Sequence, residues 1–145
     1  KDAIEKFHQN LGKIHLVVSH CDMPLTYIFS NFISSEAAQN RIASVTIVSK
    51  CGNAVEDAPQ SANFVSKVIT LPNVGRCDHT YAHWISNIAY NDVEQYGDDD
   101  VVYFIKDNDH QFGRWRSFED MLGVALINGF ACAQIMEISY QNKYS

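Results

Sequence analysis

The chain has 145 residues, of which 46% are hydrophobic and 19% charged, a size and composition typical of one globular domain and not of a disordered segment. Its formal net charge of −6 argues against nucleic acid as a partner, because no Lys/Arg cluster could neutralise a run of phosphates. No apolar run reaches the roughly 20 residues of a membrane span. We therefore expect a single domain over residues 1–145 without a membrane segment.

The chain begins with Lys1 and not with Met, so we expect it to be a fragment or a processed domain of a longer protein. This leaves its localisation open between the cytoplasm and the Golgi lumen.

The first half of the chain predicts strands that alternate with helices. After a polar helix candidate, residues 14–19 read as an apolar strand, and a helix or turn follows from Pro24 to about Ile33. Residues 45–49 form the next predicted strand, which ends at a turn over residues 50–52. The order strand, helix, strand indicates a parallel pairing.

The second half continues the alternation. A strand over residues 67–71 leads into a helix over residues 79–90, and residues 101–105 form a wholly apolar strand. Such a run is typical of a central strand that is covered on both faces. A helix capped by Ser117 and a last strand over residues 130–138 complete the prediction.

The expected fold class is therefore α/β, with a mostly parallel sheet and helices on both faces, a three-layer Rossmann-like arrangement. Ligands of such sheets bind at the carboxyl ends of the strands. The loops that follow the strands are thus the places where function is expected.

The junction between the third strand and its helix, from Leu71 to Trp84, concentrates chemically active residue types. Gly75 supplies the positive φ of a sharp turn, and Asp78 is expected to cap the helix. Asn73 and Arg76 then lie near a helix N-terminus, where the dipole and free amides favour an anion.

The helix after this junction is predicted to bury one apolar stripe and to turn His79 and His83 the other way. The stripe consists of Tyr81, Trp84, Ile85 and Ile88. In the helix that follows Ser117, the corresponding residues are Phe118, Met121, Leu122 and Ala125.

An acidic triplet, Asp107-Asn108-Asp109, follows the apolar strand 101–105. Two carboxylates at the carboxyl end of a parallel strand invite a hard cation, and Mg²⁺ or Mn²⁺ keeps open positions for phosphate oxygens. We expect this triplet to lie beside the turn that carries Arg76. The three acids at residues 98–100 precede the strand and are expected to form a solvated turn.

Four cysteines, Cys21, Cys51, Cys77 and Cys132, are widely spaced and form no CxxC pair. This spacing disfavours a zinc ribbon or a thioredoxin-type site. Free thiols and disulfides both remain open.

The segment LPNVGRCDHTYAHWI resembles the NVGRE-x-HTY signature of an uncharacterised glycosyltransferase-like family, and is more weakly similar to N-x-G-R-D of rhamnan-synthesis glycosyltransferases. The strands at residues 15–20 and 101–105, and the strand end with its Lys-Gly turn at residues 48–52, are also similar to this family, which implies a GT-A-like fold. The chain departs from the signature at Cys77-Asp78, where the family has Glu, and its acidic triplet replaces Gln-Gly. The site that the resemblance implies consists of Asn73, Gly75, Arg76, His79, Thr80 and Tyr81.

The expected function is a metal-dependent glycosyltransferase that moves a sugar from a nucleotide-diphosphate donor to an unknown acceptor. Asp107 and Asp109 would hold Mn²⁺ or Mg²⁺, and Arg76 would contact the diphosphate. Asp109, Arg76 and His79 are the expected catalytic residues. The nucleotide-sugar pocket would be lined by Asn73, Gly75, Arg76, Thr80, Tyr81 and Asp107.

Two alternatives remain. A metal-dependent hydrolase could use His79 and His83, which share one helix face at i, i+4, together with Asp107 and Asp109. A non-catalytic carbohydrate-binding domain is the other.

Overall fold

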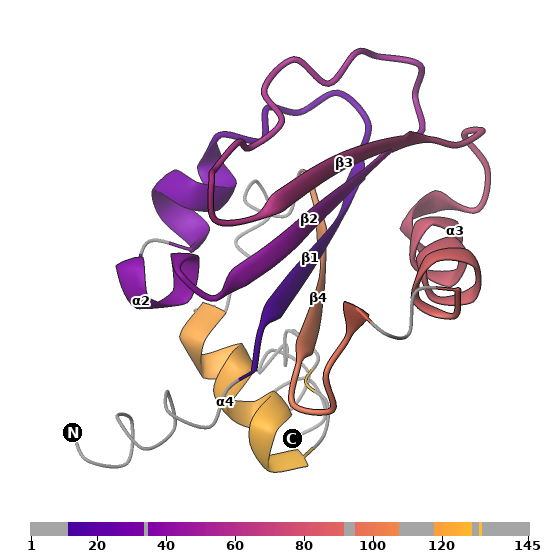
Figure 1. Cartoon of the computed structure of the whole chain (residues 1–145). Coiled ribbons are helices and arrows are strands. Elements are labelled where there is room, and N and C mark those ends of the chain that lie inside the picture. The colour runs from indigo at the N-terminus through magenta and orange to yellow at the C-terminus, as the bar shows by residue number, and fades with distance from the viewer. Residues whose placement is uncertain (1–11, 34, 92–94, 108–117, 129–130, 132–145) are drawn as a thin grey trace, which may run out of the picture.

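The computed structural model describes residues 12–33, 35–91, 95–107, 118–128 and 131. Its centre is a sheet of four parallel strands in the order β3-β2-β1-β4 (Figure 1). The strands are β1 (Ile14–His20), β2 (Ile42–Ser49), β3 (Val65–Thr70) and β4 (Val101–Lys106). The chain is therefore an α/β protein with a parallel sheet, as its alternating pattern predicted.

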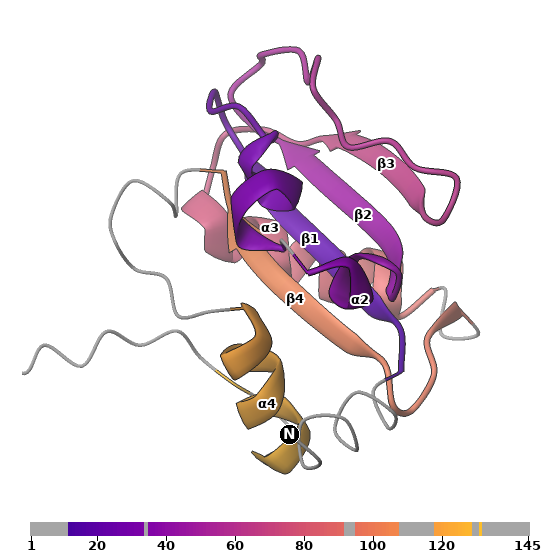
Figure 2. The same ribbon diagram turned by 90° about the vertical axis from the view of Figure 1, so that its left-hand side faces the viewer.

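Helical segments follow each of the strands β1, β3 and β4. Helix α3 (Arg76–His83) continues into the π-helical segment η2 (Trp84–Ala89), and Figure 1 shows α3 on one face of the sheet. The π-helical segment η1 (Ile28–Phe32), helix α2 (Glu36–Gln39) and helix α4 (Phe118–Asn128) lie toward the other face, which Figure 2 turns to the viewer.

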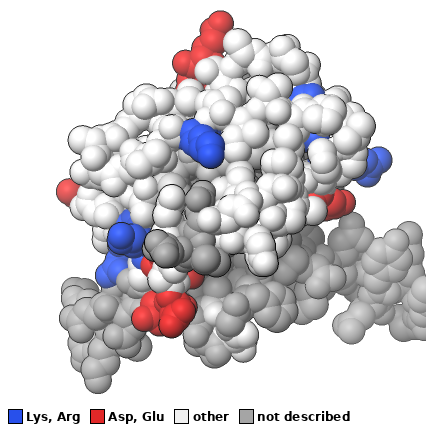
Figure 3. Space-filling view, turned by 45° about the vertical axis from the view of Figure 1, so that its right-hand side comes forward, with Lys and Arg blue, Asp and Glu red and all other residues white. Residues whose placement is uncertain are grey.

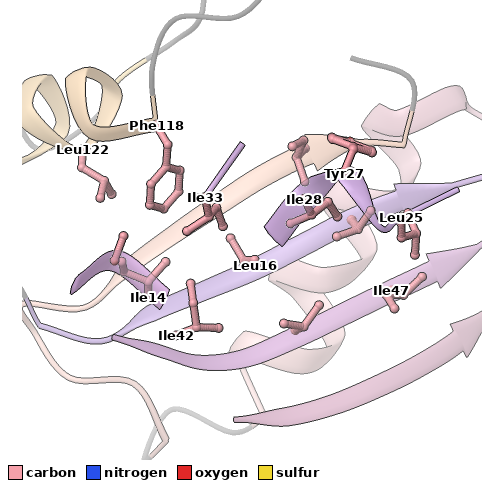
Figure 4. Close-up of a cluster of buried hydrophobic side chains, with 14 residues drawn as sticks. Ile14, Leu16, Leu25, Tyr27, Ile28, Ile33, Ile42, Ile47, Phe118 and Leu122 are labelled. Atoms are coloured by element: carbon pink, nitrogen blue, oxygen red, sulfur yellow. The ribbon is translucent and has the colours of Figure 1, made fainter. Parts of the chain in front are cut away.

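Strand β1 is buried on both faces, because its side chains alternate between two apolar clusters. Leu16 belongs to the larger cluster, together with Ile28 and Phe118 (Figure 4). Val17 points the other way and packs with Trp84 in the smaller cluster. The core thus holds helical segments against both faces of β1.

The prediction that residues 101–105 form the central strand is wrong for the described sheet. Among the described strands, β4 pairs only with β1 and so lies at an edge of the sheet, and most of its residues are only half-buried. Its apolar run has another cause: Phe104 packs against Trp84 on one face, and Tyr103 packs against Phe118 on the other. An apolar run indicates that both faces of a strand are covered, but it does not indicate how many strands pair with it.

Two details of the predicted helix at residues 79–90 also need correction. The helix begins at Arg76, and Gly75 with φ 63° takes the N-cap position that was expected of Asp78. Ile85 is 54% exposed although it was placed in the buried stripe, whereas Trp84 and Ile88 are buried. The π-helical turn after His83 carries more residues per turn, which shifts the stripe.

Helix α4 buries Phe118, Met121 and Leu122 as predicted. The N-terminal helix candidate, Ser117 and Asp109 lie outside the described residues. The predicted strand 130–138 also lies outside them, except for residue 131.

No helix in the described ranges has the length and apolarity needed to cross a membrane. On the face shown in Figure 3, the described Lys and Arg side chains are scattered over a mostly uncharged surface, and those at the lower left lie beside acidic side chains.

Candidate functional site

The segments that carry the candidate functional residues lie at the carboxyl edge of the sheet, where all four parallel strands end. These segments are the loop after β1, the loop after β2, the junction from Leu71 to Arg76 after β3, and Asp107 after β4. Connections from β1 lead through β2 to β3 on one side, whereas β4 lies on the other side of β1. The order of the sheet therefore reverses between β1 and β4, the place where ligands of open α/β sheets bind.

Asp107 lies at this reversal and is only 4% exposed. Its Oδ2 atom accepts hydrogen bonds from the backbone N–H groups of Cys21, Asp22 and Met23, at 2.7, 3.1 and 3.1 Å. Hydrogen bonds to an ionised carboxylate are the stronger kind. Asp107 therefore fixes the loop after β1, a role that the sequence prediction of a metal ligand did not include.

A disulfide between Cys21 and Cys51 joins the loops after β1 and β2, with 4.9 Å between the two Cα atoms. The side-chain amide of Asn53 reinforces the link by donating to the carbonyl oxygen of Cys21, at 3.1 Å. Cys77 is a free thiol, and Cys132 lies outside the described residues. The sequence left the pairing open, because it does not reveal which strands are neighbours.

Lys50 is a functional candidate that the sequence prediction missed. It follows β2 directly and is only 5% exposed. Its ammonium group donates hydrogen bonds to the carbonyl oxygens of Val74 and Arg76, in the junction after β3. A lysine directly after a buried apolar strand was the available signal, because that position lies at the carboxyl edge.

The junction adopts a backbone that requires glycine. Gly75 has φ 63°, and a Cβ atom built on it would lie 2.7 Å from the Cβ of His79. Arg76 also has a positive φ, 49°, which is uncommon for a residue with a side chain. Asn73 and Arg76 are both exposed, so their side chains are accessible at the start of α3.

The remaining residues of the implied site pack α3 onto the sheet. Thr80 is fully buried, and its hydroxyl group is hydrogen-bonded to that of Ser19 at 3.1 Å. The ring of Tyr81 contacts that of Phe104, with 4.8 Å between the ring centroids. His79 is half-buried, and its Nδ1 atom is buried without a hydrogen-bond partner among the described residues. His79 is therefore partly covered, although the helical pattern places it on the face opposite the apolar stripe.

Helix α3, which follows the junction, and the end of β4 meet through Ser19 of β1. The Ser19 hydroxyl bonds to Thr80, and its carbonyl oxygen accepts the backbone N–H of Asp107 at 3.1 Å. Lys50 links the end of β1 to the junction. Its backbone N–H donates to the carbonyl oxygen of His20 at 3.1 Å, and its ammonium group donates to the carbonyl oxygen of Val74. The four segments of the carboxyl edge are thus connected by direct contacts.

Within the described ranges, no three His, Cys, Asp or Glu side chains come together as metal ligands. The rings of His79 and His83 are 6.3 Å apart between centroids, and Asp107 already commits one oxygen to three amides. The described residues alone therefore do not make a metal site. Asp109, the other predicted ligand, lies outside them.

Comparison with protein-family models, curated proteins and solved structures finds no match to this chain.

Proposed function

We propose that the carboxyl edge binds a nucleoside-diphosphate sugar, and that the chain is the nucleotide-binding part of a glycosyltransferase with a three-layer, GT-A-like fold. The observation that carries the proposal is the strand order β3-β2-β1-β4, which puts the reversal of the sheet beside Asp107. The acceptor is a glycan or another hydroxyl compound whose identity the site does not specify.

Each proposed contact follows from the chemistry of the edge. The exposed guanidinium of Arg76 would pair with diphosphate oxygens, since its planar donors match two oxygens at once. The start of α3 adds a favourable dipole. Asn73 and Gly75 would contact the nucleotide, and Lys50 would keep this junction in its binding geometry.

The expected Mn²⁺ or Mg²⁺ rests on the acidic triplet alone, because the described residues do not complete a ligand set. Asp109 would be the main ligand, and Asp107 would serve chiefly to position the loop after β1. His79 remains a proposed contact to donor or acceptor, with its buried Nδ1 atom as the supporting observation.

Calorimetric titration with UDP and with GDP tests the proposal, in the presence of Mn²⁺ and of EDTA. We expect binding that Mn²⁺ strengthens about tenfold, equal to about 1.4 kcal/mol. Absence of nucleotide binding under both conditions would reject the function. Equal affinity with Mn²⁺ and with EDTA would remove the metal from the proposal. Metal binding that ignores nucleotides and depends on His79 and His83 would favour the hydrolase.

The substitution Arg76→Lys tests the diphosphate contact. Arginine and lysine place the same demand on the positive φ of this backbone position. The substitution therefore removes the bidentate guanidinium and leaves the backbone requirement unchanged. We expect a loss of about 1–3 kcal/mol in nucleotide binding with an unchanged melting temperature. Arg41→Lys is the matched control, because Arg41 precedes β2 at the other end of the strands. Equal losses in the two variants would contradict a specific role for Arg76.

A further inference from the structure

A cavity that none of the candidate site residues lines lies between η1, the end of α2 and the connection from β2 to β3. It has a volume of about 380 Å³, is open to solvent on one side, and is lined by residues of the segment before η1, of η1, of the end of α2 and of the connection from β2 to β3. Pockets for small ligands span about 300–1,000 Å³, so this one has the size for a compact molecule.

One wall of the cavity is aromatic. The rings of Phe29 and Phe64 stack almost in parallel, with an interplanar angle of 8° and 5.5 Å between centroids. Both side chains are half-buried and pack against the main core cluster. Their rings are therefore held in place before any ligand arrives, which lowers the entropic cost of binding.

Polar side chains also line the cavity, and two of them are held in place. The side-chain nitrogen of Gln39 donates to the carbonyl oxygens of Phe29 and Ile33, at 3.1 and 2.6 Å. One carboxylate oxygen of Asp57 accepts the backbone N–H of Leu25. These bonds leave the side-chain oxygen of Gln39 and the second carboxylate oxygen of Asp57 as acceptors.

Three further amide side chains, those of Asn40, Gln60 and Asn63, line the mouth of the cavity and are exposed. An amide group both donates and accepts hydrogen bonds, as does a hydroxyl group. The lining includes one acid, Asp57, and neither Lys nor Arg. A phosphate or a nucleotide would therefore meet no compensating charge there.

We propose that this cavity binds an uncharged sugar ring, with the C–H face of the ring against Phe29 and Phe64 and its hydroxyl groups on the amides and on Asp57. An apolar face with several hydroxyl groups at its rim matches one aromatic wall and one wall of amides. The inference does not rest on the proposed transferase activity, since the cavity and the carboxyl edge share none of the residues that carry the two arguments.

Titration of ¹⁵N-labelled protein with glucose, galactose, mannose and N-acetylglucosamine, followed by NMR, tests this proposal. We expect saturable shifts around Gln60 and Phe64 with at least one of the four sugars. UDP, added separately, should leave these signals unchanged. The proposal is overturned if none of the sugars shifts them, or if UDP shifts them as sugars do.

Variants sharpen the test. Phe64→Leu keeps an apolar side chain but removes the ring, and we expect about fivefold to tenfold weaker sugar binding. Gln60→Ala, at an exposed position, should weaken sugar binding without loss of stability. This variant still tests the proposal if Phe64→Leu does not fold. Gln95→Ala is the control, because this exposed amide lies outside the cavity. Unchanged sugar affinity in Gln60→Ala and in folded Phe64→Leu would assign the binding to another surface.

Discussion

Lys50 illustrates how one buried charge can organise a loop. Removal of an ammonium group from water is costly, and the carbonyl oxygens of Val74 and Arg76 offset this cost. Those carbonyls lie in a turn that contains two residues with positive φ, Gly75 and Arg76. The lysine thus stabilises a backbone that the turn would not adopt at low energy by itself.

We expect Lys50→Met to destabilise the protein by about 1–3 kcal/mol, because the thioether fills the space of the stem but leaves the two carbonyls without their donor. Nucleotide affinity should fall with it. Urea denaturation measures the first effect and calorimetry the second. Lys13→Met, at an exposed position before β1, is the control and should stay within about 0.5 kcal/mol of the wild type.

At the scale of elements, the sequence predicted every described strand, since apolar runs and turn residues are local signals. It failed where the answer depends on neighbours. The apolar run 101–105 does not reveal that β4 ends the described sheet, and the helical stripe does not reveal the π-helical turn that exposes Ile85.

The candidate site was predictable in the same uneven way. The turn at Gly75 and the exposed Arg76 could be read from the junction, because both depend on local backbone chemistry. The amide contacts of Asp107, the reach of Lys50 and the pairing of Cys21 depend on which strands are adjacent. Topology supplies that information, and one sequence does not.

The amino ends of three strands are held together by Asp100. Its Oδ1 atom accepts the N–H of Lys13 at 2.8 Å, and its Oδ2 atom accepts the N–H of Gly97 at 2.8 Å and contacts His15 Nε2 at 3.1 Å. His15 Nδ1 in turn bonds to the hydroxyl of Ser44 on β2, at 2.8 Å. The residues at 98–100 were expected to form a solvated turn, so the role of Asp100 is a correction.

Burial acts to raise the pKa of Asp100, but the hydrogen bonds from Gly97, His15 and Lys13 outweigh it and hold the pKa below its ordinary value. A carboxyl group with a lowered pKa stabilises the fold above its unfolded-state pKa, about 3.9, and loses that contribution as the pH falls through its folded-state pKa. We expect the free energy of unfolding to drop below about pH 4.

Asp100→Asn should be less stable than the wild type at pH 7 and should lose less of its stability on acidification. Urea denaturation at pH 7 and at pH 3 measures both effects. Asp98→Asn serves as the exposed control. A wild type and an Asp100→Asn variant with parallel pH profiles would contradict this assignment.

At the scale of the molecule, the carboxyl edge is a single connected unit. The disulfide joins β1 to β2 across 30 positions of sequence, Asp107 joins β4 to β1, and Lys50 joins β2 to the junction after β3. A disturbance of any one link should therefore reach the others.

Reduction of the disulfide by dithiothreitol should lower the free energy of unfolding by about 3–4 kcal/mol, the loop entropy released in the unfolded chain. Thermal and urea unfolding with and without the reductant measure this change. The double variant Cys21→Ser, Cys51→Ser should match the reduced protein and should no longer respond to dithiothreitol. Cys77→Ser, which removes a free thiol among the described residues, should keep the full response. A wild type whose stability does not change with reductant would refute the prediction.

The other end of the described sheet has its own consequence. Strand β3 is an outer strand, with Val65 71% and Val68 47% exposed, and such a strand offers unpaired backbone groups to a second molecule. Lys67 lies between these valines and is exposed. Pairing of two β3 strands would bring like charges together and strip them of water, so Lys67 protects the protein from aggregation at high concentration.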